Sequence, residues 1–138
     1  MAAINLQKIV AVKGQPGLFH LINYNSKGYF LQPFEGGATR FFSNEKGKVL
    51  AVGNVDLKLK EGSINSLQIF LQMKDTEVPS QNTSNDDISF FFEQLIPNLD
   101  DSVAPSHLEK VWKWYHLIAD QYQMHDLVND EDDGLNII

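Results

Sequence analysis

The chain has 138 residues, of which 43% are hydrophobic and 21% are charged, and its formal net charge at pH 7 is -7. This composition is typical of a globular protein and argues against a wholly disordered chain. The absence of cysteine excludes disulfides, thiol catalysis and metal sites with cysteine ligands. No stretch approaches the roughly 20 apolar residues of a membrane span, and residues 1–8 lack the pattern of a signal peptide. We therefore expect a cytoplasmic protein that is not attached to a membrane.

The negative charge is concentrated in the second part of the chain. Residues 1–78 contain nine Lys/Arg against six Asp/Glu, whereas residues 79–138 contain two against twelve, so the two parts carry +3 and -10. Binding to nucleic acid depends on several contacts of Lys and Arg with phosphates. Nucleic-acid binding by the whole chain is therefore not expected, and binding by the mildly basic front part remains an alternative.

The first residues contain two competing patterns. Asn5 can cap a short helical turn, whereas residues 9–12 are rich in β-branched side chains and favour a strand. Residues 13–17 form a turn in either case, because proline presets φ and glycine tolerates a positive φ.

The following residues predict a sheet. Runs of aromatic and β-branched residues alternate with turns that contain glycine, and this spacing is that of a meander. Pro33 has no N–H to donate to a neighbouring strand, so its strand should end there or lie on an edge of the sheet. A later run alternates as Val-Asp-Leu-Lys-Leu, which is the pattern of a half-buried strand with Asp56 and Lys58 exposed. The predicted strands cover residues 18–23, 29–34, 38–43 and 55–59.

Two shorter helices are predicted from apolar residues at helical spacing. The first covers residues 64–74 and can be capped by Ser63. The second covers residues 88–96 and stops at Pro97, because proline cannot continue a helix.

A third and longer helix is predicted at residues 106–124. Ser106 and Glu109 have the spacing of a capping box, in which each side chain satisfies a backbone N–H at the helix start. The helix carries one apolar stripe, which must be covered by the rest of the protein. The stripe consists of Leu108, Val111, Trp112, Tyr115, Ile118, Ala119 and Tyr122, with Leu117 at its margin.

These elements predict an α+β fold in four parts. Residues 1–76 form a β-rich front module, a small bent antiparallel sheet of the SH3-like barrel type with one helix. Residues 77–87 form a linker that is nearly free of apolar side chains, and residues 88–128 form a two-helix module. Residues 129–138 form an acidic tail.

The chain resembles a family of small uncharacterised proteins from the Bacteroidota. Residues 8–19, which read Lys-Ile-Val-Ala-Val-Lys-Gly-Gln-Pro-Gly-Leu-Phe, are similar to the N-terminal signature of that family. Its second block is matched by Phe-Phe-Glu-Gln-Leu-Ile-Pro at residues 91–97 and by Lys-Trp-Tyr-His-Leu-Ile at residues 113–118. The resemblance implies a β-rich N-terminal module and a helical C-terminal one, and it brings no activity, cofactor or catalytic residue.

Four aromatic side chains are candidates for a binding surface. Trp114 lies off the apolar stripe of the long helix, where it either contacts a partner or packs against the front module. Phe19, Tyr29 and Phe34 belong to a sheet in which residues 29–34 carry apolar groups on both faces. One of these faces is therefore either covered by the helices or forms a binding groove.

Metal and cofactor motifs are weak or absent. His116 and Asp120 have a spacing that can place two ligands side by side, but a third ligand would have to come from elsewhere. Residues 129–134 resemble the first half of a calcium loop and lack the glutamate that closes such a loop. The sequence contains no phosphate-binding loop and no nucleophile elbow, so no cofactor is expected.

Three functions follow as hypotheses. The first is a non-enzymatic interaction or adaptor protein that binds an unidentified protein partner, with an oligomeric state that the sequence leaves open. The second is a nucleic-acid-associated regulator, in which the basic front binds and the acidic tail competes for the same surface. The third is an enzyme with an unrecognised site, which needs a pocket with convergent polar groups. The first is favoured because catalytic and nucleotide-binding motifs are absent.

Overall fold

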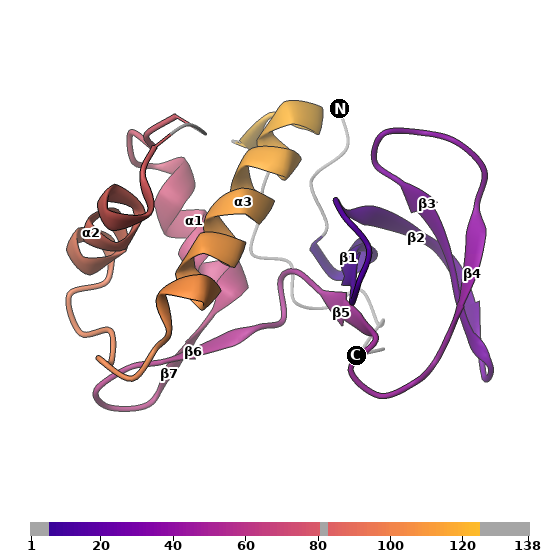
Figure 1. The fold of residues 1–138 in the computed structure, drawn as a ribbon, viewed down its shortest axis with the longest axis horizontal. Coiled ribbons are helices and arrows are strands. Elements are labelled where there is room, and N and C mark those ends of the chain that lie inside the picture. The colour runs from indigo at the N-terminus through magenta and orange to yellow at the C-terminus, as the bar shows by residue number, and fades with distance from the viewer. Residues whose placement is uncertain (1–5, 81–82, 125–138) are drawn as a thin grey trace.

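The computed structural model describes residues 6–80 and 83–124, and it has the mixed α+β fold that the sequence predicts (Figure 1). Asn5, predicted as an N-cap, and residues 129–138, predicted as an acidic tail, lie outside the described residues. Within the described ranges no helix is long and apolar enough to cross a membrane. The elements in chain order are η1 (Leu6–Lys8), β1 (Ile9–Val12), β2 (Phe19–Asn25), β3 (Gly28–Pro33), β4 (Arg40–Ser43), β5 (Val49–Ala51), β6 (Asp56–Lys58), β7 (Ser63–Asn65), α1 (Ser66–Lys74), α2 (Asn85–Leu95) and α3 (Pro105–Gln121).

Five strands form one antiparallel sheet in the order β4-β3-β2-β1-β5. Strands β2, β3 and β4 pair with their sequence neighbours, which confirms the predicted meander, and Pro33 ends β3 as expected. Strand β1 pairs Val10 with Phe19 of β2 and with Ala51 of β5. Because β4 and β5 lie at the two edges, the described strands form an open sheet rather than a closed barrel.

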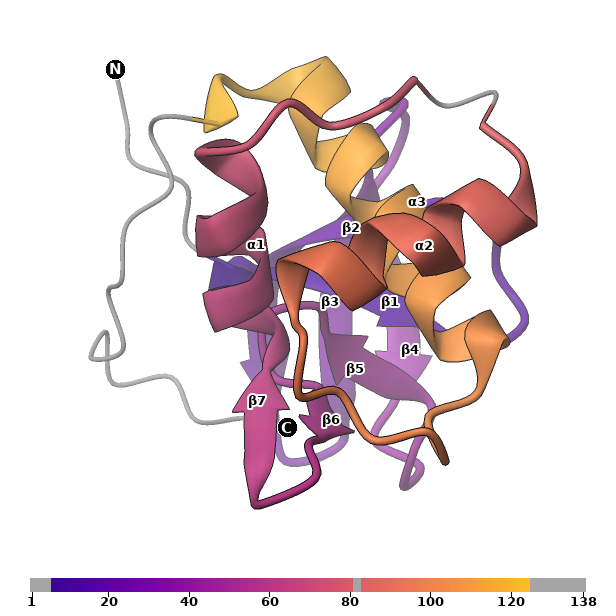
Figure 2. The same cartoon turned by 90° about the vertical axis from the view of Figure 1, so that its left-hand side faces the viewer.

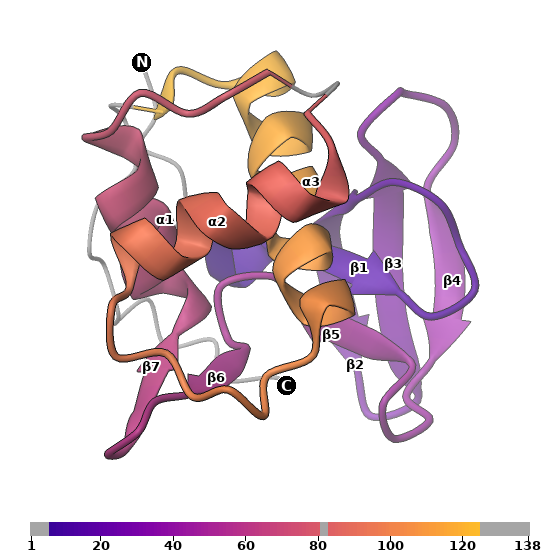
Figure 3. The ribbon, with the colours of Figure 1, turned by 60° about the vertical axis from the view of Figure 1, so that its left-hand side comes forward.

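A separate two-stranded hairpin precedes the first helix. Strands β6 and β7 pair with each other and lie at the foot of α1 (Figure 3). Asp56 and Lys58 are exposed and Leu57 between them is buried, as the alternating pattern predicts. The hairpin therefore buries Leu57 in the core, packs the half-buried Ile64 against it and keeps Asp56 and Lys58 in solvent.

The five-stranded sheet buries side chains on both faces. Val10 and Val12 belong to a small cluster on one face, whereas Ile9 and Ala11 pack against the main core on the other, because successive side chains of a strand point in opposite directions. The main core also contains residues of all three α-helices, so the front of the chain and its helices share one core. The small cluster consists of Val10, Val12, Phe19, Leu21, Leu31, Val49 and Ala51.

Helix α3 lies between the sheet and the other two helices (Figures 1 and 2). Its Trp112 packs edge-on against Phe91 of α2, with ring centroids 5.5 Å apart, and its Tyr115 stacks on Phe70 of α1 at 6.3 Å. Because it has neighbours on several sides, α3 buries more than one stripe, and Trp114 is only 6% exposed. Ala119, which the periodicity placed on the stripe, is instead exposed.

The predicted capping box at the start of α3 is wrong. The helix begins at Pro105, and its N-cap Ala104 makes no side-chain hydrogen bond. Proline suits the first helical position because its φ is preset and it has no N–H that a cap would need to satisfy. Ser106 and Glu109 therefore lie inside the helix and do not form its cap.

The starts of the other two helices also differ from the prediction. Helix α1 is capped by Asn65 rather than by Ser63, because Ser63 belongs to β7. Helix α2 begins at Asn85, earlier than predicted, because the hydroxyl of Ser84 accepts a hydrogen bond from the N–H of Asp87 at 3.3 Å. Polar residues that resemble a linker in the sequence thus form the first turn of a helix.

Candidate functional site

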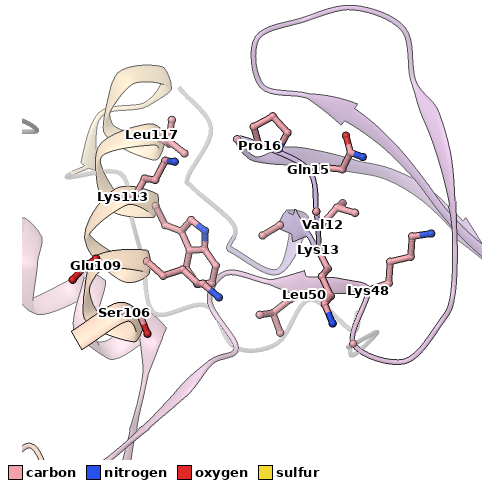
Figure 4. A pocket seen from close by; sticks show the side chains of 16 residues that line it. Val12, Lys13, Gln15, Pro16, Lys48, Leu50, Ser106, Glu109, Lys113 and Leu117 are labelled. Carbon is pink, nitrogen blue, oxygen red and sulfur yellow. The ribbon is translucent and has the colours of Figure 1, made fainter. Parts of the chain in front are cut away.

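A cleft of about 540 Å³ lies between α3 and the part of the sheet formed by β1 and β5 (Figure 4). One wall, the front wall, consists of β1, the turn that follows it and the start of β5, and the other wall is one face of α3. The front wall includes Val12, Lys13, Gln15, Pro16, Lys48 and Leu50, and the helix wall includes Ser106, Glu109, Lys110, Lys113, Trp114 and Leu117.

Backbone hydrogen bonds shape the front wall. The turn after β1 is closed by the N–H of Gln15, which donates to the carbonyl of Val12 at 3.0 Å, and Gly14 adopts a φ of 82° there. A positive φ of this kind is readily adopted only by glycine. The N–H of Lys13 donates to the carbonyl of Lys48 at 2.8 Å, so the backbones of these two lysines are held beside each other in the front wall.

Helical spacing shapes the opposite wall. Ser106, Lys110, Lys113 and Leu117 follow one another at intervals of three and four residues, which places them on one face of α3. Trp114 lies beside them and is almost completely buried. Together with the half-buried Leu117 and with Leu50 of β5, it makes the cleft partly apolar, while four lysines line the two walls.

The cleft is positively charged although the chain is acidic. It is lined by four lysines, here called the cleft lysines, and by one carboxylate, that of Glu109. Within residues 6–80 and 83–124, the one ion pair that forms between side chains joins Lys58 and Asp100 at 3.9 Å, and neither lines the cleft. The cleft lysines therefore form no ion pair with the described carboxylates, and together with Glu109 they leave the cleft with a net positive charge. They are Lys13, Lys48, Lys110 and Lys113.

The four aromatic residues proposed from the sequence lie in different places. Trp114 lines the cleft. Phe19 is buried in the small cluster, where Arg40 lies over its ring at 5.4 Å, and Tyr29 packs against the same cluster. Phe34 is half-buried and stacks on His20 with ring centroids 4.4 Å apart. The structure does not bring these four side chains together in one surface.

Sequence reasoning did not find the cleft lysines, although one signal was available. Lys110 and Lys113 are the two positive residues in the otherwise acidic residues 79–138, and they lie three apart on one helix. That pattern placed two charges on one helical face. It did not show that the turn after β1 would place two further lysines opposite them.

The three histidines in the described part of the chain, His20, His107 and His116, do not line the cleft. Burial lowers the pKa of His116 from its ordinary value of 6.5, while a hydrogen bond to the backbone of Pro79 and the carboxylate of Asp120 act in the opposite direction. The Nε2 atom of His116 is buried without a partner among the described residues, as is Nε1 of Trp112, and the two rings are 4.8 Å apart. In the described part of the chain, no group of three His, Asp or Glu side chains is placed to hold a metal ion with His116 and Asp120.

Comparison with known proteins finds a similar fold in one solved structure. No family model matches the chain, and no curated protein matches it significantly. The chain is similar to the solution NMR structure of a structural-genomics target from Bacteroides vulgatus, with a TM-score of 0.61 and 17% identity over 85% of this chain and 87% of that chain. This neighbour agrees with a relationship to uncharacterised Bacteroidota proteins, and at this identity it shows the fold alone.

Proposed function

We propose that the protein is a non-enzymatic interaction protein that binds a segment of another protein in the cleft between α3 and the sheet. The observation that carries the proposal is a partly apolar cleft with lysines on both walls that form no ion pair with a carboxylate of the described residues. Covering apolar surface supplies binding free energy, and charges around it select and orient the partner. In this proposal residues 1–76 and 88–128 act as the two sides of one binding site and residues 77–87 join them.

The chemistry of the cleft favours binding over catalysis. Enzymes gather acids, bases and nucleophiles with shifted pKa values around a pocket. Among the residues that the structure describes, the cleft is lined by one carboxylate and one hydroxyl, those of Glu109 and Ser106, and by no histidine or aspartate. The side chains whose pKa values are shifted by burial or hydrogen bonding lie elsewhere, and they include His20, Asp100, Tyr115, His116 and Tyr122.

The lysines also favour a second candidate, a nucleic-acid-associated regulator. Lys13 and Lys48 belong to the mildly basic front part, and phosphates bind to lysines in such clusters. This candidate has to be tested on the full chain, because the front part shares its core with α2 and α3. A chain cut near Val78 would lose those helices and expose that core.

The proposal is tested by capturing partners from a lysate of the source cell with the tagged full chain, with and without nuclease. A cleft variant, Lys13→Glu with Lys113→Glu, is compared with a control, Lys27→Glu with Lys60→Glu, which changes the charge equally at exposed lysines outside the cleft. We expect a nuclease-resistant protein partner that the control retains and the cleft variant loses. Equal capture by both variants, or no capture, contradicts the proposal, and capture that depends on nucleic acid favours the regulator.

A further inference from the structure

The geometry points to the chemistry of the partner: we infer that the segment bound in the cleft is short and acidic and carries at least one apolar side chain. This inference rests on the proposed function and adds to it the class of ligand. It follows from the distribution of charge, the apolar residues in the cleft and the size of the cleft.

The first step concerns charge. Lys13 and Lys48 come from the front wall and Lys110 and Lys113 from α3, so both walls of the cleft carry positive charge that favours an acidic ligand. The described residues place no carboxylate in an ion pair with these lysines, so binding an acidic segment breaks no such pair. A single exposed ion pair contributes little, and the selection of an acidic partner therefore depends on several pairs acting together.

The apolar part of the cleft favours a partner that also carries an apolar side chain. Leu50 and Leu117 are half-buried, and Trp114 beside them is 6% exposed. A purely acidic segment would leave the two leucines in contact with water, whereas an apolar side chain in the segment would cover them. The partner therefore combines acidic and apolar residues.

The burial of Trp114 and the size of the cleft favour a peptide over a nucleic acid as the ligand. Proteins that bind single strands expose aromatic rings on which bases stack, along an extended basic groove. Trp114 is too deeply buried to offer its face, and the cleft has no arginine among its lining residues. Its volume of about 540 Å³ is that of a site for a small ligand or a few residues.

The net charge of the chain points the same way. At physiological ionic strength charges are screened over about 8 Å, so a short segment interacts mainly with the cleft lysines. A long polyanion also extends beyond the cleft over a chain whose overall net charge is -7, and is repelled there. A short acidic segment is therefore favoured over a nucleic-acid strand.

The test uses fluorescently labelled synthetic peptides of about eight residues, a length that spans about 25 Å when extended. The probe contains glutamate and leucine, and three comparison ligands are used with it. One peptide replaces each glutamate with glutamine, one replaces each leucine with serine, and the third ligand is a single-stranded DNA of similar length. Binding to the full chain is measured by fluorescence anisotropy at about 50 mM and about 300 mM salt.

We expect the glutamate and leucine probe to bind more tightly than all three comparison ligands and to weaken at the higher salt concentration. The variant Lys13→Gln with Lys113→Gln should bind the probe at least about threefold more weakly than the natural chain, because two ion pairs are lost. The control Lys27→Gln with Lys60→Gln should bind it unchanged. The inference is overturned if the glutamine peptide or the DNA binds as tightly as the glutamate and leucine probe. It is also overturned if both variants weaken the binding of the probe equally.

The outcomes separate this inference from the function on which it rests. If a lysate partner is lost by the cleft variant but the acidic probe does not bind, the interaction function stands and the inferred chemistry is wrong. If the cleft variant loses neither a lysate partner nor the acidic probe, both are wrong.

Discussion

The hydroxyl of Tyr122 lies 3.3 Å from Nδ1 of His20, and this contact joins the end of α3 to strand β2. The ring of Phe34 completes the group, with its centroid 4.4 Å from that of His20 and 6.3 Å from that of Tyr122. The residues of α3 that line the cleft lie earlier in the helix, between Ser106 and Leu117. The cleft therefore lies beside a helix whose C-terminal end is attached to the sheet.

Replacing Tyr122 with phenylalanine tests this attachment, because it removes the hydroxyl and keeps the ring. A hydrogen bond contributes about 1 kcal/mol net, so the free energy of unfolding in urea should fall by about 0.5–1.5 kcal/mol. The control is Tyr24→Phe, at a tyrosine that is 42% exposed, where we expect a change within about 0.5 kcal/mol. Equal losses in the two variants would show that the contact with His20 does not stabilise the fold.

Stability should fall in mildly acidic solution. Burial lowers the pKa of His20 and of His116 from the ordinary value of 6.5, so below that pH the unfolded chain binds more protons than the folded one. The contribution of these groups to the free energy of unfolding is therefore unchanged above 6.5 and decreases as the pH falls from 6.5 through the folded-state pKa values.

The measurement is urea denaturation at about pH 7 and about pH 5, a range that brackets the unperturbed pKa of histidine. The variant His20→Gln with His116→Gln should lose less stability between the two pH values than the natural chain does. His107→Gln, at an exposed histidine, serves as the control and should behave like the natural chain. If the double variant loses as much stability as the natural chain between the two pH values, the loss does not come from His20 and His116.

The packing of α2 on α3 gives a matched pair of substitutions on one helix. Phe92 is fully buried and contacts the ring of Trp112, so Phe92→Ala should lower the free energy of unfolding by about 3–5 kcal/mol. Phe90 is 60% exposed, and Phe90→Ala should change it by less than about 0.5 kcal/mol. Thermal or urea unfolding of both variants checks the orientation of α2. A larger loss of stability in Phe90→Ala than in Phe92→Ala would contradict that orientation.

Helix starts provide a further matched pair. Ser84 caps α2 through its hydrogen bond with the N–H of Asp87, and Ser84→Ala should cost about 1 kcal/mol of stability. Ser106 lies inside α3 and caps nothing, so Ser106→Ala should change stability by less than about 0.5 kcal/mol. A larger loss at Ser106 than at Ser84 in urea denaturation would show that α3 begins at Ser106.

Periodicity in the sequence predicted the buried side chains correctly where an element packs on one side only. Alternation predicted the exposed Asp56 and Lys58 on either side of a buried leucine, and helical spacing predicted most of the buried face of α3. It left two alternatives for Trp114, which is buried although it lies off the predicted stripe, because a helix with neighbours on several sides buries residues beyond one stripe. It also misplaced the start of α3, because a capping box and a proline at the first position are competing signals in adjacent residues.

The cleft itself could not be read from the sequence. Lys13 and Lys48 become neighbours through a backbone hydrogen bond between two strand ends, and α3 then faces them. Such a juxtaposition depends on strand register and helix packing, which local sequence patterns do not show. The uneven distribution of charge along the chain was visible, but its position in space was not.

The central claim is that the cleft between α3 and the sheet binds an acidic segment. The most direct test follows the backbone amide signals of the 15N-labelled full chain by NMR while the glutamate and leucine peptide is added. The account predicts that the largest shifts occur in residues 12–17, 48–50 and 106–117, which include both walls of the cleft. Largest shifts around the exposed Ile22 and Phe41 at the other end of the sheet, or no shifts at all, would contradict it.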